Sequence, residues 1–256
     1  SPVFAVADGM GGHLGGAQAS SRAVITLQEF LSPCRLGNRP VDLVDLSVAI
    51  DAAATSVAAL APADNPMSAP GTTLSGLMVL RTTEGPYWLS FNVGDSRAYV
   101  VGGGGIRQLT HDNSALQEAR DLAATSGAPR VIPPANVVTK ALGAGQSGSV
   151  KADYTIMPLE EGDRAVICTD GVHGVLQDAQ IHAVVAAGDG PQGSADALVR
   201  ASLETGTRDN TTAVVVYAGT ESRVTLTTNV LNRMIQPVRP ASIQTARRVP
   251  RREGSN

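Results

Sequence analysis

The order of the expected elements predicts an α+β fold in which antiparallel sheets are sandwiched between helices. Two helical segments come first, a series of short strands follows, two further helices come next, and one strand closes the pattern. Tight turns separate several of the strands, which favours antiparallel pairing over alternating βαβ units.

The composition fits one folded unit with a sizeable core. The chain has 256 residues, of which 43% are hydrophobic. No apolar run is long enough to cross a membrane, and the first residues do not form a charged-then-apolar leader. Of the two cysteines, Cys168 falls inside an apolar strand, so we expect a reduced, cytoplasmic protein. The sequence leaves the oligomeric state open.

The formal charge of −3 is unevenly distributed. Residues 218–256 carry seven Arg against two Glu, a balance of +5, so the remainder carries −8. An acidic body suits cation binding and argues against nucleic-acid binding by the core. The basic tail could contact nucleic acid or membrane phosphate, but a solvated linker or tether is the simpler interpretation.

Apolar residues at helical spacing predict a helix over residues 18–31, which ends near Pro33. A second helix is expected from about residue 42 to residue 61, where Pro62 stops it. We expect these two helices to lie together on one face of a sheet.

The middle of the chain predicts strands over residues 73–80, 87–93, 98–101 and 106–109, joined by tight turns as an antiparallel meander. The glycine run at 102–105 could cradle a phosphate, but no helix follows it, so a hairpin tip is favoured. The expected elements that follow are a helix at 111–125, a loop at 126–136, a strand or its approach at 137–142, strands at 154–157 and 164–168, helices at 178–187 and 192–205, and a strand at 211–217.

Four aspartates share one context, because each stands at the end of an apolar strand. They are Asp8, Asp95, Asp170 and Asp209. A carboxylate at the end of a buried strand costs several kcal/mol unless a cation or several donors compensate it. Mg²⁺ and Mn²⁺ prefer oxygen ligands and are usually held by a few carboxylates and water. The pattern therefore predicts a divalent-cation site.

The motifs that contain these aspartates resemble, in order and spacing, those of bacterial metal-dependent protein serine/threonine phosphatases, the PPM or type 2C family. The resemblance covers residues 2–217. It rests on Asp8-Gly9-Met10-Gly11-Gly12-His13, Gly71-Thr72-Thr73, Gly94-Asp95-Ser96-Arg97, Leu109-Thr110 with Asp112, Ala141-Leu142-Gly143, Thr169-Asp170-Gly171 and Asp209-Asn210-Thr211.

The resemblance implies a β-sandwich of two antiparallel sheets flanked by helices on both sides (α-β-β-α). It also implies hydrolysis of phosphoserine and phosphothreonine in proteins by a metal-activated water. Asp8, Asp170 and Asp209 would be the catalytic residues. Asp8 would bridge two Mn²⁺ or Mg²⁺ ions, the Gly9 carbonyl would bind one of them, and Asp170 and Asp209 would bind the other. Asp95 and Asp170 together would hold a third, weaker ion.

Several positions depart from the family pattern. Met10 stands where many eukaryotic members have a His proposed as general acid, Asn113 where a His is common, and Gly174 where some members have another metal-binding Asp. We expect no catalytic role for the four histidines, and we expect His173 and His182 to be surface residues. Ser96 and Thr169 flank candidate metal ligands and could support them, but hydrogen bonding within the local turn is the simpler expectation.

Residues 1–217 are expected to form the catalytic domain, and residues 218–256 a basic, largely disordered tail. In the family, an upstream strand carries an Arg that binds the phosphate and an acid that completes the second metal's ligands. The given sequence starts directly at the strand before Asp8. We therefore expect the domain to lack that strand, and expect unequal metal affinities and slower turnover without it.

Two alternatives remain. A pseudophosphatase would keep the fold and bind phosphoproteins without hydrolysis, and whether all metal ligands are present distinguishes it from an active enzyme. A nucleotide-binding module built on residues 8–16 would need a Gly-Lys-Ser/Thr or a dinucleotide fingerprint, and neither is present.

Overall fold

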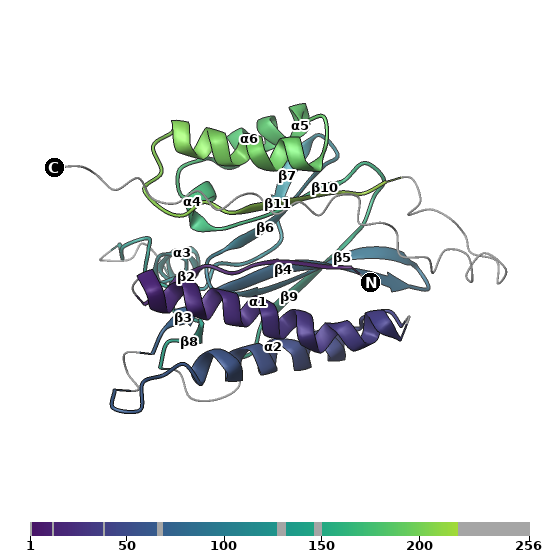
Figure 1. Cartoon of the computed structure of the whole chain (residues 1–256). Coiled ribbons are helices and arrows are strands. Elements are labelled where there is room, and N and C mark those ends of the chain that lie inside the picture. Colours follow the sequence, from purple (N-terminus) through teal and green to yellow (C-terminus); the bar gives the residue numbers. More distant parts are fainter. Residues whose placement is uncertain are drawn as a thin grey trace.

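Two four-stranded antiparallel sheets pack face to face between two pairs of helices, which gives the four layers seen in Figure 1. The computed structural model describes residues 2–11, 13–37, 39–65, 69–126, 132–145 and 150–219. The expected α-β-β-α sandwich is confirmed.

The first sheet has the strand order β1-β4-β5-β9. Its strands are β1 (Val3–Val6), β4 (Leu74–Thr82), β5 (Gly85–Val93) and β9 (Asp153–Pro158). The second sheet has the order β11-β10-β6-β7. Its strands are β11 (Ala213–Tyr217), β10 (Arg164–Cys168), β6 (Arg97–Gly102) and β7 (Gly105–Gln108).

A third, small sheet of two-residue strands lies beside the first residues of α1. Its order is β2-β3-β8, with β2 (Gly9–Met10), β3 (Gly71–Thr72) and β8 (Leu142–Gly143). Residues 137–142, expected to be a strand or its approach, are the approach: they contain an isolated bridge between Ser114 and Val138 and lead into β8.

The expected meander from residue 73 to residue 109 is wrong, because the chain changes sheets in the middle of it. β5 pairs with β4 and β9, whereas β6 pairs with β7 and β10. The crossing lies between Val93 and Arg97, and Gly94 takes a positive φ of 110° there. Asp95 thus sits where the chain passes from one sheet to the other.

Helices α1 (His13–Leu36) and α2 (Leu43–Ala58) cover the outer face of the first sheet, as expected (Figure 1). α1 continues past its expected end, with Pro33 inside the helix. α2 begins at a capping box in which the Asp42 side chain accepts the Asp45 N–H and the Asp45 side chain accepts the Asp42 N–H.

Helices α5 (Asp178–Ala187) and α6 (Pro191–Glu204) cover the second sheet. α3 (Ala115–Ser126) follows β7, and the one-turn helix α4 (Asp170–His173), which the sequence reasoning missed, follows β10. The Gly-rich segment before β7 forms a hairpin tip between β6 and β7, as favoured above.

Buried side chains form one apolar cluster in each of the three interfaces between layers. Strand β10 shows how: Val166 and Cys168 face α5 and α6, whereas Ala165 and Ile167 face the other sheet. Both alternations of such a strand are buried, which explains its uniformly apolar sequence. Cys34 and Cys168 are both buried and free.

No helix in the described part of the chain is both long and apolar enough to cross a membrane. The expectation of a disordered tail concerns residues 220–256, which lie outside the described residues.

Candidate functional site

Asp8 and Asp170 meet at one edge of the sandwich, although they follow strands of different sheets. Asp8 comes two residues after β1, and Asp170 two residues after β10. Burial, the negative charge of Asp170 and a hydrogen bond to Asp170 together raise the pKa of Asp8 to about 8. Burial also raises the pKa of Asp170, against the opposing effect of the hydrogen bond with Asp8. Burial of two neighbouring carboxyl groups therefore favours the protonated form of the pair.

Asp95 belongs to the same group of charges. Its side chain is 8% exposed. Burial first, and then the negative charge of Asp170, raise the pKa of Asp95 to about 6. The sheet crossing thus brings this third aspartate to the edge where Asp8 and Asp170 lie.

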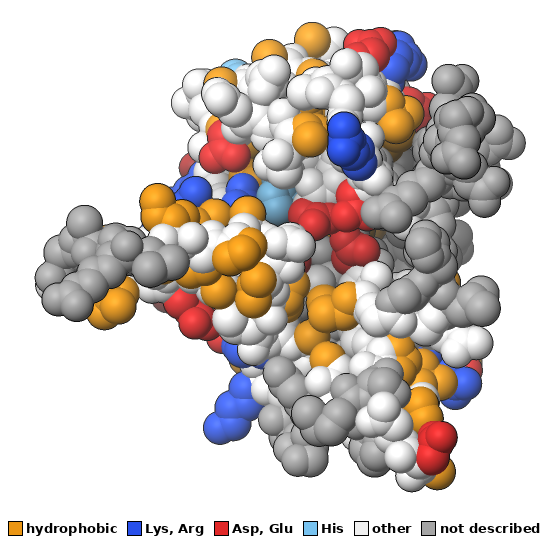
Figure 2. All heavy atoms as spheres, turned by 90° about the vertical axis from the view of Figure 1, so that its left-hand side faces the viewer, with side chains coloured by type: hydrophobic (Ala, Val, Ile, Leu, Met, Phe, Trp, Pro, Cys, Tyr) orange, Lys and Arg blue, Asp and Glu red, His pale blue; other side chains and the backbone are white. Residues whose placement is uncertain are grey.

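Asp209 lies nearby but is more exposed, in the loop that leads into β11. Its charge acts on both Asp8 and Asp170. Its Oδ1 accepts the N–H of Asn210 at 2.8 Å. All four sequence-predicted aspartates are therefore gathered at one edge, and Figure 2 shows acidic side chains in the middle of this face.

Two threonines hold the backbone of Asp8: Thr72, in strand β3 of the small sheet, and Thr73, which follows it. The Asp8 N–H donates to Thr73 Oγ1 at 3.0 Å, and the Thr72 hydroxyl donates to the Asp8 carbonyl at 2.9 Å. Thr73 Oγ1 also lies 2.8 Å from Ser96 Oγ. Ser96 therefore links the Asp95 loop to Asp8, and the expectation that it bonds only within its own turn is wrong.

Thr169 makes a corresponding link on the other sheet. Its Oγ1 accepts the Thr212 N–H at 3.1 Å and donates to the Asn210 carbonyl at 3.4 Å. The strand end that carries Asp170 is thereby joined to the loop that carries Asp209. A purely local role for Thr169 is also wrong.

Side chains hold the backbone of the two residues that flank Asp95, Gly94 and Ser96. Asn113 Oδ1 accepts the Gly94 N–H at 2.9 Å, and Asn92 Nδ2 donates to the Gly94 carbonyl at 2.8 Å. The Ser75 hydroxyl donates to the Ser96 carbonyl at 2.8 Å. The loop is therefore preorganised by protein groups alone.

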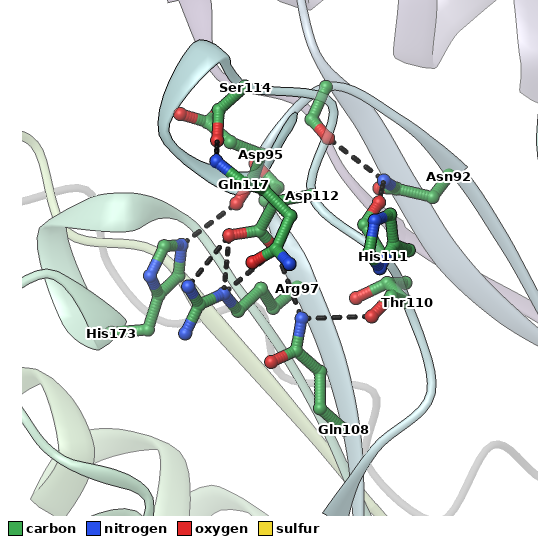
Figure 3. Close-up of polar contacts among 12 residues, drawn as sticks. Asn92, Asp95, Arg97, Gln108, Thr110, His111, Asp112, Ser114, Gln117 and His173 are labelled. Atoms are coloured by element: carbon green, nitrogen blue, oxygen red, sulfur yellow. Dashed lines mark hydrogen bonds and ion pairs between the residues drawn. The ribbon is translucent and has the colours of Figure 1, made fainter. Parts of the chain in front are cut away.

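The guanidinium group of Arg97 is bound by other side chains of the protein, as Figure 3 shows. Its Nε and Nη2 donate to the Asp112 carboxylate at 2.7–3.0 Å, and its Nη1 donates to the Tyr99 hydroxyl at 3.1 Å. Gln108 adds a further donor to Asp112 at 3.0 Å. Arg97 thus anchors the end of the Asp95 loop to Asp112 and Tyr99, and its guanidinium group is not free to bind an anion.

His173 joins this region from α4. Its Nε2 lies 2.9 Å from the Asp95 carbonyl oxygen (Figure 3). Burial and the positive charge of Arg97 lower the pKa of His173 to about 4. The expectation of a surface residue is therefore wrong for His173. The sequence offered one signal for this role, namely its position three residues after Asp170.

Gly9 is required by a close backbone approach. A Cβ on Gly9 would lie 1.9 Å from the Gly16 carbonyl oxygen, at the start of α1. Only glycine allows the two segments to come so near. Gly9 also pairs with Thr72 in the small sheet, so its place next to Asp8 is fixed by two elements.

The residues present fit a divalent cation. The Oδ1 atom of Asp170 is buried and makes no hydrogen bond to any described group. A buried oxygen without a partner, beside two further carboxyl groups whose pKa values are raised, is an environment that a cation would relieve. Among the described residues, no three His, Cys, Asp or Glu side chains already form a closed metal-holding group.

Comparisons with known proteins identify the family of the chain. The sequence profile of the family described as protein phosphatase 2C matches residues 1–205. A serine/threonine phosphatase stp of Listeria innocua is 27% identical over 217 residues, which cover 84% of each chain. A serine/threonine protein phosphatase PstP of Mycobacterium tuberculosis is 28% identical over 83% of this chain and 40% of that protein.

Solved structures show the same relationship. The PPM Ser-Thr phosphatase MsPP of Mycobacterium smegmatis, in complex with cacodylate, superposes with a TM-score of 0.70 at 30% identity, over 85% of this chain and 88% of that chain. The catalytic domain of PstP with two manganese ions gives 0.67 at 28% identity, over 83% and 86% of the two chains. The chain belongs to the protein phosphatase 2C family.

Proposed function

We propose that this chain is an active, cation-dependent phosphatase that hydrolyses phosphoserine and phosphothreonine in proteins. The single observation that carries the proposal is the meeting of Asp8 and Asp170, with raised pKa values and an unpartnered buried oxygen, at the edge where the two sheets end. The names of the relatives supply the substrate class.

The proposed ligands of two Mn²⁺ or Mg²⁺ ions are Asp8, the Gly9 carbonyl, Asp170 and Asp209, and Asp95 would serve a third, weaker ion with Asp170. When bound, such ions lower the pKa of a shared water and neutralise charge on the phosphoryl oxygens. The aspartates then need only hold and orient, so no Ser or Cys nucleophile is required. Thr73, Ser96 and Thr169 keep the carboxylates at fixed spacings.

A pseudophosphatase is the weaker candidate. A protein that only bound phosphoproteins would have no need of four aspartates gathered at one edge, with the cost of burying like charge. The loop around Asp95 is also held by a hydrogen bond to each neighbouring peptide group, which is the preorganisation that a reacting site needs.

Turnover of a phosphothreonine peptide, with manganese and then with excess EDTA, tests the proposal. We expect hydrolysis that requires the cation and is restored when manganese is added back. Binding of the peptide without release of phosphate, at saturating manganese, would instead establish the pseudophosphatase.

We further propose that residues 1–217 form the catalytic unit and that the basic tail from residue 237 onward is dispensable for chemistry. The family match ends at residue 205, and β11 completes the second sheet at Tyr217. Truncation after Gln236 should leave turnover unchanged, and a large loss would show that the tail contributes to the site. A reducing, cytoplasmic location is proposed from the two free cysteines.

A further inference from the structure

His173 connects the two strand ends that carry Asp95 and Asp170. It is the last residue of α4, whose first residue is Asp170. Its Nε2 lies 2.9 Å from the carbonyl oxygen of Asp95. A carbonyl oxygen can only accept, so Nε2 carries the proton and donates. One side chain therefore joins the backbone of one aspartate to the helical turn that begins at the other.

The turn that carries His173 is itself well anchored. The Gly174 N–H donates to the Asp170 carbonyl at 2.7 Å, and the Leu176 N–H donates to the Val172 carbonyl at 2.9 Å. Val172 is fully buried in the cluster beneath α5 and α6. Because this turn is fixed to the core, a change in the His173 bond changes the position of the Asp95 loop rather than that of α4.

The surroundings of the ring favour a fixed orientation. Figure 3 shows the His173 ring beside Arg97 and directed toward Asp95. Arg97 is held by Asp112 and by the Tyr99 hydroxyl. Side chains hold three successive carbonyl groups here: Asn92 binds that of Gly94, His173 that of Asp95 and Ser75 that of Ser96.

We propose that His173 is a positioning residue, which holds Asp95 opposite Asp170 and thereby sets the affinity of this carboxylate pair for a divalent cation. The proposal rests on the proposed function, since it assigns a cation to the pair. His173 touches neither the cation nor the substrate and acts through Asp95 alone. Groups that orient ligands in this way typically change metal affinity by about 10–100-fold.

Three substitutions separate this role from simple packing. His173→Phe keeps a ring but removes the donor. His173→Gln keeps an N–H donor at a similar reach, because the Gln amide nitrogen can stand near the position of Nε2. Asp95→Asn removes a carboxylate from the pair and so identifies the binding step that belongs to it. His182→Phe on α5 is the matched control, because it makes the same change away from the four aspartates.

The experiment is calorimetric titration of the purified full chain with manganese chloride, together with thermal unfolding of each variant in EDTA. We expect Asp95→Asn to abolish the weakest binding step and His173→Phe to weaken that step about tenfold, with the tighter steps unchanged. His173→Gln should restore most of the lost affinity, and His182→Phe should match the wild type.

Three results would overturn the role of His173. They are an unchanged weak step in His173→Phe, an equal weakening of all steps that accompanies a lower unfolding temperature, and a His173→Gln variant as weak as His173→Phe. A wild-type chain that binds no manganese at all would overturn the proposed function and this inference together. That result is distinguishable from the first three because each of them is measured against a wild-type chain that binds manganese.

Discussion

Asp8 lies beside Asp170 although the two residues follow strands of opposite sheets, and burial together with the negative charge of Asp170 raises the pKa of Asp8 to about 8. Near neutral pH, the folded protein without a cation therefore favours a protonated Asp8 carboxyl. A divalent cation would favour the ionised carboxylates instead. Cation binding at this edge should therefore be linked to proton release.

Substitution of Asp170 by Asn should reduce hydrolysis of an aryl phosphate at saturating manganese by at least about a hundredfold. The variant should fold normally, because it removes one of several buried like charges and keeps a group of the same size. Asp209→Asn should behave in the same way. Asp64→Asn, at an exposed position, is the control for a lost aspartate and should keep wild-type turnover. Near-normal rates in either site variant would remove that residue from the assignment.

The stability of the cation-free protein should decrease as the pH rises from about 4 to about 8. The pKa of Asp8 is near 3.8 without these neighbours, as in the unfolded chain, and about 8 in the folded protein. Between these two pKa values the folded state binds more protons than the unfolded state. The free energy of unfolding therefore falls as the pH rises, until the pH has passed the folded pKa. Asp95, with its pKa raised to about 6, contributes in the same direction. The loss should be on the order of a few kcal/mol.

Denaturant unfolding in EDTA at several pH values measures this effect. Asp8→Asn should flatten the dependence, because its amide can donate to Asp170 at every pH. Excess manganese should reverse the trend, since the cation binds the ionised pair more tightly as the pH rises. A wild-type protein in EDTA that became more stable between about pH 5 and about pH 8 would contradict the burial of these charges.

Breaking the buried hydrogen bond between Trp88 and Asp163 should lower stability without lowering activity. Trp88 Nε1 donates to Asp163 Oδ2 at 2.9 Å, and both residues are at most 4% exposed. Asp163→Ala leaves the indole N–H unpaired and should cost about 1–3 kcal/mol. Asp163→Asn keeps an acceptor and should cost less. Asp163 precedes β10, whereas Asp170 follows it, so turnover of folded protein should stay normal.

Fluorescence of the single Trp during denaturant unfolding reports on this pair directly. Equal stability of Asp163→Ala and the wild type would mean that solvent replaces the carboxylate as acceptor. A selective loss of turnover, with stability unchanged, would mean that the far end of β10 is coupled to the site in a way that these contacts do not explain.

Sequence reasoning found the four aspartates because strand ends and glycines are local signals. The ends of β10 and α5 were also predicted correctly, since a uniformly apolar run and a helical pattern define them. The pairing of β6 was not predicted correctly, because the residues before it give no sign that the chain changes sheets at Gly94. The contacts of Ser96, Thr169 and His173 span 23 to 78 residues. The position of His173 three residues after Asp170 places it near the site, but no local pattern identifies the partner of any of these three side chains.

The approach of β2 to the start of α1 gives the last prediction. A Cβ on Gly9 would lie 1.9 Å from the carbonyl oxygen of Gly16, 2.3 Å from its carbonyl carbon and 2.9 Å from its Cα. These are backbone atoms, so no side-chain rotation can relieve the overlap. Gly9 is also paired with Thr72, whose hydroxyl holds the carbonyl of Asp8. The methyl group must therefore displace either α1 or the segment that carries Asp8.

Gly9→Ala should consequently lower both stability, by about 1–3 kcal/mol, and turnover. A shift of about 1 Å in a ligand-bearing segment can cost roughly a hundredfold in rate. Gly105→Ala is the matched control, because no atom lies within 4 Å of a Cβ built there and its φ is not positive. Manganese titration of both variants separates the causes: a misplaced Asp8 weakens the tight cation steps, whereas a displaced α1 lowers stability and leaves them intact. A Gly9→Ala protein with wild-type stability, cation affinity and turnover would show that the two segments can separate without consequence for the site.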